Sequence, residues 1–189
     1  MYNKRLEASK KLNSDFADIF PQKQVRAYSD LYDNAISLMK SKDLEAFDLT
    51  KEPQELRDKY GLDNFGQGCL LARRLIENKV RFVEVSYGGW DMHNDVFGSM
   101  ETRGAVLDSG LSSLLEDLNV RGLLSDTMVV VASEFGRTPE VKAGRVGRDH
   151  HPSAFSVLFA GGGVKGGYVH GRSDERAHYV EENGVDVPS

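Results

Sequence analysis

Aspartate, glutamate and histidine side chains, which are common protein ligands of divalent metal ions, occur in three short segments of this chain of 189 residues. The residues are Asp91, His93, Glu134, Asp149 and His150. Carboxylate oxygens and neutral imidazole nitrogens are the donors that zinc, manganese and iron accept. We expect a divalent metal ion, zinc in the first place and manganese or iron as alternatives. The expected ligands are Asp91, His93, Asp149 and His150, with Glu134 as a further ligand or a catalytic base.

A bound ion of this kind could polarise an ester oxygen or lower the pKa of water to about 7. Arg137 and Arg148 lie in the same segments, and guanidinium groups match the oxygens of phosphate or sulfate. We expect these two arginines to hold a small anionic ester substrate. The alternative is that each acidic or histidine pair only caps a turn or contacts solvent, and adjacent histidines do not easily face the same way.

Three apolar runs next to these segments predict strands, and the intervening residues predict helices. Residues 80–85, 127–132 and 155–160 are the expected strands, while residues 67–78 and a leucine-rich stretch ending near Gly122 are expected to be helical. Strands alternating with helices indicate an α/β fold with a mostly parallel sheet between helical layers. The carboxyl ends of parallel strands share one sheet edge, so the first two polar segments should emerge together there.

The remaining chain predicts helices without clustered chemistry. Residues 1–60 form an expected helical portion, with helices over about residues 22–40 and from Pro53 to before Gly61, and residues 61–189 carry the site. We expect both portions to belong to one domain. The single cysteine, Cys69, lies at helical spacing in an apolar run and is expected to be a buried core residue.

The composition and charge pattern argue against a nucleic-acid partner and against a membrane-spanning segment. The 24 basic and 29 acidic residues are mixed along the chain and give a net charge of −5, so no basic footprint for nucleic acid is present. No apolar run approaches the length of about 20 residues that a membrane span requires. The first residues lack the apolar core of a signal peptide.

Several motifs, taken in order, resemble the bacterial family named domain of unknown function 1501, which is placed in the alkaline phosphatase/sulfatase superfamily. The resemblance covers about residues 60–172. Its motifs are Phe65-Gly66-Gln67, the helix at 70–75, the strand at 80–85, Gly88-Gly89-Trp90-Asp91-Met92-His93, Ser133-Glu134-Phe135-Gly136-Arg137-Thr138-Pro139, Gly147-Arg148-Asp149-His150 and the glycine-rich segment 160–167.

The resemblance implies a three-layer α/β/α sandwich like that of alkaline phosphatase, and a metal-dependent hydrolase of phosphate or sulfate esters. In the superfamily, an aspartate and a nearby histidine after one strand, with a later histidine, hold one metal, and Asp91, His93 and His150 match those places. The place of a second metal reads Glu134-Phe135 here. The carboxylate is kept there and the imidazole is not, so a second metal in the usual mode is not expected.

The resemblance also implies that the family's first strand, with its nucleophile and often an export signal, precedes the helices seen here. We therefore expect an incomplete domain, shortened at both ends, in which a metal-activated water replaces the nucleophile and an open sheet edge favours homo-oligomers. Family members are often exported to the periplasm or beyond, which leaves the localisation of this chain open. The alternative function is a non-catalytic member with a binding or surface-assembly role; a phosphosugar mutase would need the absent nucleophile region.

Overall fold

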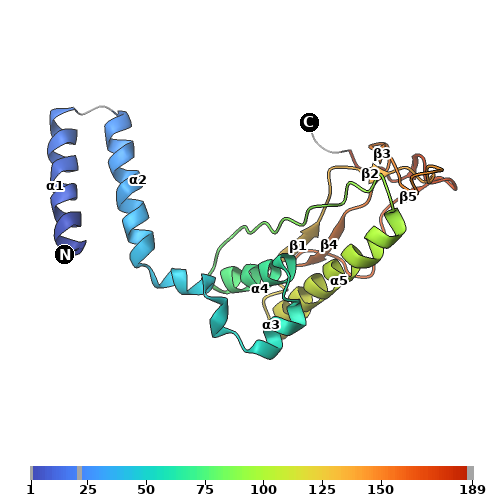
Figure 1. Ribbon diagram of the computed structural model, residues 1–189, viewed down its shortest axis with the longest axis horizontal. Helices are drawn as coiled ribbons and strands as arrows, with labels where there is room; N and C mark the ends of the chain where they lie inside the picture. Colours follow the sequence, from blue (N-terminus) through green and yellow to red (C-terminus); the bar gives the residue numbers. More distant parts are fainter. Residues whose placement is uncertain (1, 21–22, 187–189) are drawn as a thin grey trace. The chain divides into compact units, whose positions relative to one another are not determined.

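Two helices, α1 (Tyr2–Ile19) and α2 (Lys23–Lys40), form a hairpin in the first of two units of the chain (Figure 1). The computed structural model describes residues 2–20 and 23–186, and the units are Met1–Asp48 and Leu49–Ser189. The 3-10 helix η1 (Lys42–Phe47) completes the first unit. Helix α2 confirms the predicted helix, except that Gln22, at its expected start, lies outside the described residues.

The second unit begins with four helical segments that enclose its core. They are η2 (Leu49–Lys51), α3 (Gln54–Tyr60), α4 (Asn64–Glu77) and α5 (Val96–Val120). Asp63 caps α4, because its side chain accepts hydrogen bonds of 2.9 Å from the backbone N–H groups of Phe65 and Gly66. The core cluster contains Tyr60, Phe65, Cys69, Leu70, Leu114 and Leu118. The predicted helices of this unit are therefore confirmed.

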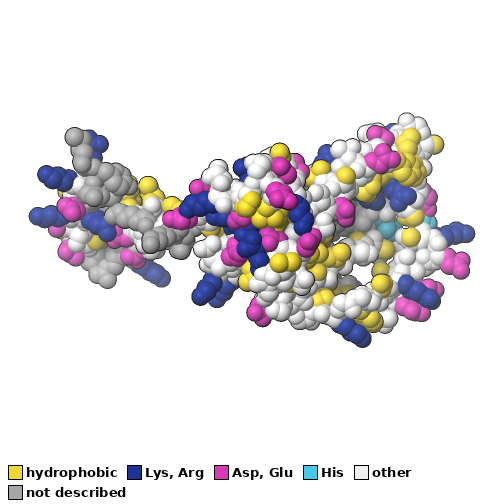
Figure 2. Space-filling model, turned by 90° about the horizontal axis from the view of Figure 1, so that it is seen from below, with side chains coloured by type: hydrophobic (Ala, Val, Ile, Leu, Met, Phe, Trp, Pro, Cys, Tyr) yellow, Lys and Arg dark blue, Asp and Glu magenta, His cyan; other side chains and the backbone are white. Residues whose placement is uncertain are grey.

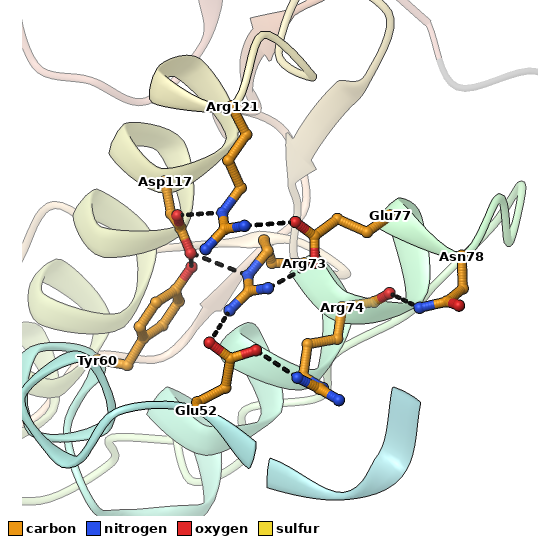
Figure 3. Close-up of polar contacts among 8 residues, drawn as sticks. All are labelled: Glu52, Tyr60, Arg73, Arg74, Glu77, Asn78, Asp117 and Arg121. Carbon is orange, nitrogen blue, oxygen red and sulfur yellow. Dashed lines mark hydrogen bonds and ion pairs between the residues drawn. The ribbon is translucent and has the colours of Figure 1, made fainter. Parts of the chain in front are cut away.

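A charged network fastens α4 to α5 and to the segment before α3 (Figure 3). Its centre is Arg73, whose side chain is 1% exposed and whose guanidinium pairs with Glu52 at 2.8 Å, Glu77 at 2.5 Å and Asp117 at 2.9 Å. The Tyr60 hydroxyl donates a hydrogen bond of 3.0 Å to Asp117. A charge this deeply buried requires such partners, so the network fixes the three segments in one arrangement.

The strands form three short antiparallel ribbons. Strand β1 (Met128–Val131) pairs with β4 (Leu158–Gly161), β2 (Gly136–Arg137) with β3 (His150–His151), and β5 (Arg172–Ser173) with β6 (Val180–Glu182). The prediction of a mostly parallel, alkaline-phosphatase-like α/β/α sandwich is wrong. The physical reason is that β1 and β4 pair directly in opposite directions, so no helical crossover joins them as parallel neighbours.

The predicted strand at residues 80–85 is extended but belongs to no strand ladder in the described part of the chain. Its side chains alternate as a strand's would, with Val83 and Val85 half-buried and Phe82 80% exposed. Val85 packs against the core cluster. The apolar alternation therefore correctly predicts which side chains of the segment are half-buried. It does not predict whether the backbone pairs with another strand.

Two further expectations hold in the described residues. Cys69 is buried in the core, and burial raises the pKa of its thiol to about 12, as expected for an inert structural cysteine. None of the described helices combines the length and the apolar character needed to cross a bilayer.

Candidate metal centre

Three potential metal-ligand atoms from two distant segments meet at one point. Asp91 Oδ1 lies 3.0 Å from His93 Nε2 and 2.9 Å from His150 Nε2, and the two imidazole nitrogens are 3.2 Å apart. Neighbouring ligand atoms around a tetrahedral zinc ion lie roughly 3.3–3.6 Å apart, given ligand distances of about 2.0–2.2 Å. The three atoms therefore already have nearly the spacing of ligands around a single ion.

Hydrogen bonds alone do not give the polar atoms of Asp91, His93 and His150 a favourable set of donors and acceptors. Asp91 Oδ1 also accepts a hydrogen bond of 2.8 Å from Arg137 Nη2, so three nitrogens surround one carboxylate oxygen. If both imidazoles donate their Nε2 protons to Asp91, these two donors face each other across 3.2 Å. A cation between the three atoms would use the nitrogen lone pairs instead and remove this conflict.

Antiparallel pairing and backbone hydrogen bonds bring the two ligand segments together. The loop before β3 lies along residues 92–96, where Arg148 N donates to Met92 O at 3.2 Å and Val96 N donates to Val146 O at 2.9 Å. A Cβ atom at Gly147 would lie only 1.9 Å from His93 O, so this close approach requires glycine. In the view of Figure 1, the labelled strands β2, β3 and β5 are drawn near the N-terminal end of α5.

The cluster is open to solvent on one side and bounded by side chains on the other. The side chain of Asp91 is 66% exposed and that of His150 is 46% exposed, whereas Met92 is buried and anchors the segment. The ring of Phe135 lies 4.4 Å from that of His150, between centroids, and restricts the imidazole. Figure 2 shows histidine atoms at the surface with basic and acidic side chains around them.

The charge of Asp91 is stabilised by its neighbours. A hydrogen bond from His150, followed by one from Arg137, lowers the pKa of the Asp91 carboxyl to about 2. The carboxylate is therefore ionised over the whole range of ordinary pH, as a metal ligand must be.

Asp149, predicted as a ligand, lies on the other side of the His93 ring. Its Oδ1 is 3.5 Å from His93 Nδ1, and its Oδ2 forms an ion pair of 2.8 Å with Lys142. Arg145 is a further neighbour at 3.7 Å. The hydrogen bond from Lys142 is the main reason why the pKa of Asp149 is lowered.

The three remaining predicted site residues lie in strand β2 and in the segments next to β2 and β3. Arg137, in β2, reaches both Asp91 and the backbone oxygen of Trp90, the latter at 3.2 Å. In the described structure, Arg137 Nη1 and Arg148 Nε are buried and have no hydrogen-bond partner. Glu134 is exposed in the bend between β1 and β2 and is not part of the converging trio. Its role as ligand or base stays a prediction.

Sequence reasoning missed the side chains that support the trio. Lys142 and Arg145 were given no role, and Phe135 was considered only as the residue in the place of a second metal's imidazole, although each lies within five residues of a predicted site residue. A second polar cluster was also missed, in which His151 Nε2 lies 2.7 Å from the backbone oxygen of His178. Its two histidines are 27 residues apart, and no spacing rule connects them.

Comparison with known proteins gives a family without an assigned activity. Residues 2–189 match the family described as "Protein of unknown function (DUF1501)". Neither the curated proteins nor the solved structures contain a match to the chain.

Proposed function

The chain belongs to the DUF1501 family, described as proteins of unknown function, and we propose that it is a divalent-metal-dependent hydrolase of phosphate or sulfate esters. The observation that carries this proposal is the convergence of Asp91 Oδ1, His93 Nε2 and His150 Nε2 within 3.2 Å of one another. Function is argued from this site rather than from the fold, because one chemistry can occur on unrelated folds.

The donor set fits a catalytic rather than a structural metal site. Two imidazoles and one carboxylate are three protein ligands, and catalytic zinc sites keep a further position open for water or substrate. The exposure of Asp91 and His150 leaves that side accessible. A divalent ion in such a site supplies Lewis acidity, which polarises an ester oxygen and lowers the pKa of water.

Arg137 supports the choice of an anionic substrate. Its Nη2 donates to Asp91, a proposed ligand, while its Nη1 is buried without a partner in the part of the chain that the structure describes. The Arg137 side chain is 22% exposed, and the positive charge that it holds beside Asp91 attracts a phosphate or sulfate group to the ion. Arg148 Nε is also buried without a partner in the described part of the chain, and a role of Arg148 in substrate binding stays a prediction.

A binding role without catalysis is the second candidate. It is favoured by the openness of the cluster, since the Asp91 side chain is 66% exposed and water has free access to it. Enzymes that depend on electrostatic stabilisation of a reacting group usually exclude water from it. The two candidates share the metal and differ only in turnover.

Hydrolysis of p-nitrophenyl phosphate and p-nitrophenyl sulfate separates the two candidates. The chain is assayed after chelation and after reloading with zinc, manganese or iron(II), beside Asp91→Asn, Arg137→Ala and the control Asp126→Asn, which alters an exposed aspartate outside the site. We expect metal-dependent turnover that is lost in D91N and unchanged in D126N. R137A should keep its metal and lose about 10–100-fold in kcat/KM, the effect of one charge-assisted hydrogen bond. A metal-loaded chain without turnover would support the binding role instead.

A further inference from the structure

Asp149 occupies a position that the backbone fixes from both sides. Its N–H donates to Thr138 Oγ1 at 3.1 Å, and its carbonyl oxygen accepts from Thr138 N at 2.9 Å. The loop between these residues closes on itself through the hydrogen bond from Lys142 N to Gly147 O, at 2.9 Å. The side chain of Asp149 is therefore presented from a rigid point rather than from a free loop.

The carboxylate of Asp149 lies between a lysine and the far nitrogen of a proposed ligand. Lys142 Nζ contacts Oδ2 at 2.8 Å, while Oδ1 is 3.5 Å from His93 Nδ1. The Nε2 atom of the same ring is directed at Asp91 and His150. Because the two ring nitrogens point away from each other, a group beside Nδ1 is poorly placed to bind an ion at Nε2.

We propose that Asp149 is a positioning residue, which orients His93 through Nδ1 and does not itself bind the metal ion. The inference rests on the proposed metal site. An imidazole that binds a metal through Nε2 carries its proton on Nδ1, and a carboxylate that accepts this proton fixes the tautomer and the ring orientation. Lys142 holds the carboxylate in place for this contact. The metal site therefore consists of three ligands and one supporting carboxylate.

The affinity of the full chain for zinc and for cobalt(II) tests this assignment. Titrations compare the wild type with three variants: Asp149→Asn, Lys142→Met and Glu140→Gln. K142M removes the ion pair between Lys142 and Asp149 and keeps Asp149 itself. E140Q is the matched control for D149N: it also replaces a carboxylate of this loop by an amide, but Glu140 contacts His178 and not His93. Circular dichroism confirms that each variant is folded.

We expect D149N to bind one metal ion with an affinity about 10–100-fold weaker, the usual effect of losing an outer carboxylate. The visible absorption of its cobalt complex should keep the pattern of the wild type, because no ligand is lost. E140Q should bind as the wild type does, and K142M should lose less affinity than D149N.

Three results would overturn the assignment of Asp149 and leave the proposed metal site in place. Loss of stoichiometric metal in D149N, with a changed cobalt spectrum, would make Asp149 a ligand. Equal losses in K142M and D149N would give Asp149 only a structural role in the loop, and unchanged affinity in D149N would remove any role. A folded wild type that binds neither ion would contradict the proposed function itself, and the inference would fail with it.

Discussion

Asp91 shows which features of the candidate metal site can be predicted from residue types alone. Its carboxylate, with His93 and His150, could be named from the sequence because carboxylates and imidazoles clustered in a few loops are unusual outside functional sites. The structure brings these three together. Two features of His93 could not be predicted from the sequence. Its Nε2 atom faces the cluster, and its Nδ1 atom faces Asp149. Both depend on side-chain direction, which the spacing of residues in a loop does not determine.

Glu52 gives a prediction at the same scale. Burial works to raise the pKa of this carboxyl, but hydrogen bonds from Arg73 and Arg74 outweigh it, so the net pKa is lowered. A pKa that is lower in the folded state than in the unfolded state stabilises the fold at pH values above the ordinary glutamate pKa of about 4.3. This stabilisation is lost as the pH falls through the pKa of Glu52 in the folded state.

We therefore expect Glu52→Gln to be less stable than the wild type at pH 7, by about 3–5 kcal/mol for a broken buried pair. The difference between the two proteins should shrink below about pH 4. Urea unfolding at pH 7, 5 and 3.5 measures it. Glu116→Gln, which affects an exposed pair with Lys59, should cost about 0–1 kcal/mol. A pH-independent difference for E52Q would contradict this explanation.

At the scale of elements, the apolar runs identified strands but not their partners. Residues 127–132 contain β1, and residues 155–160 overlap all of β4 except Gly161, so the existence of both strands was predictable. Their antiparallel direction was not, because a fully apolar run is typical of a buried strand in either kind of sheet. The parallel sheet edge expected to assemble the site is absent from the described residues. The β2–β3 ribbon and the backbone contacts of residues 145–148 assemble it instead.

Gly147 tests whether these backbone contacts build the site. In Gly147→Ala the new Cβ would lie 1.9 Å from His93 O, so the loop must move away from the segment that carries Asp91 and His93. We expect metal affinity to fall at least as far as it does on losing an outer-shell partner, about 10–100-fold. The helical content should not change, because the core cluster lies elsewhere.

The matched control is Gly166→Ala, since a Cβ atom there meets no other atom within 4 Å. Calorimetric titration with zinc compares the two variants, and circular dichroism reports their helices. Wild-type affinity in G147A would show that the loop contact does not position the ligands.

At the scale of the whole molecule, the core and the candidate site belong to one unit. Every residue of the core cluster and of the metal trio lies in Leu49–Ser189, whereas Met1–Asp48 contains α1, α2 and η1. The helices expected in this part of the sequence are present in its described residues. The structure divides the chain after Asp48, because α3 packs with α4 and α5.

We expect a chain of residues 49–189 to fold and to bind metal as the full chain does. All members of the core cluster, and Arg73 with its partners Glu52, Glu77 and Asp117, lie within Leu49–Ser189. Circular dichroism, urea unfolding and zinc titration on the shortened and full chains measure this. A shortened chain that is unfolded, or that is folded and no longer binds zinc, would show that the first unit contributes to the second.

The proposed metal centre requires that Asp91, His93 and His150 bind a divalent metal ion. Mass spectrometry of the purified full chain tests this binding directly, because it measures the metal content. The wild type is compared with a His93→Ala/His150→Ala double variant, and circular dichroism confirms that both are folded. We expect nearly one divalent ion per chain in the wild type and none in the double variant. A folded wild type without metal, even after incubation with zinc, manganese or iron(II), would contradict the metal centre and leave the three side chains as a hydrogen-bonded surface cluster.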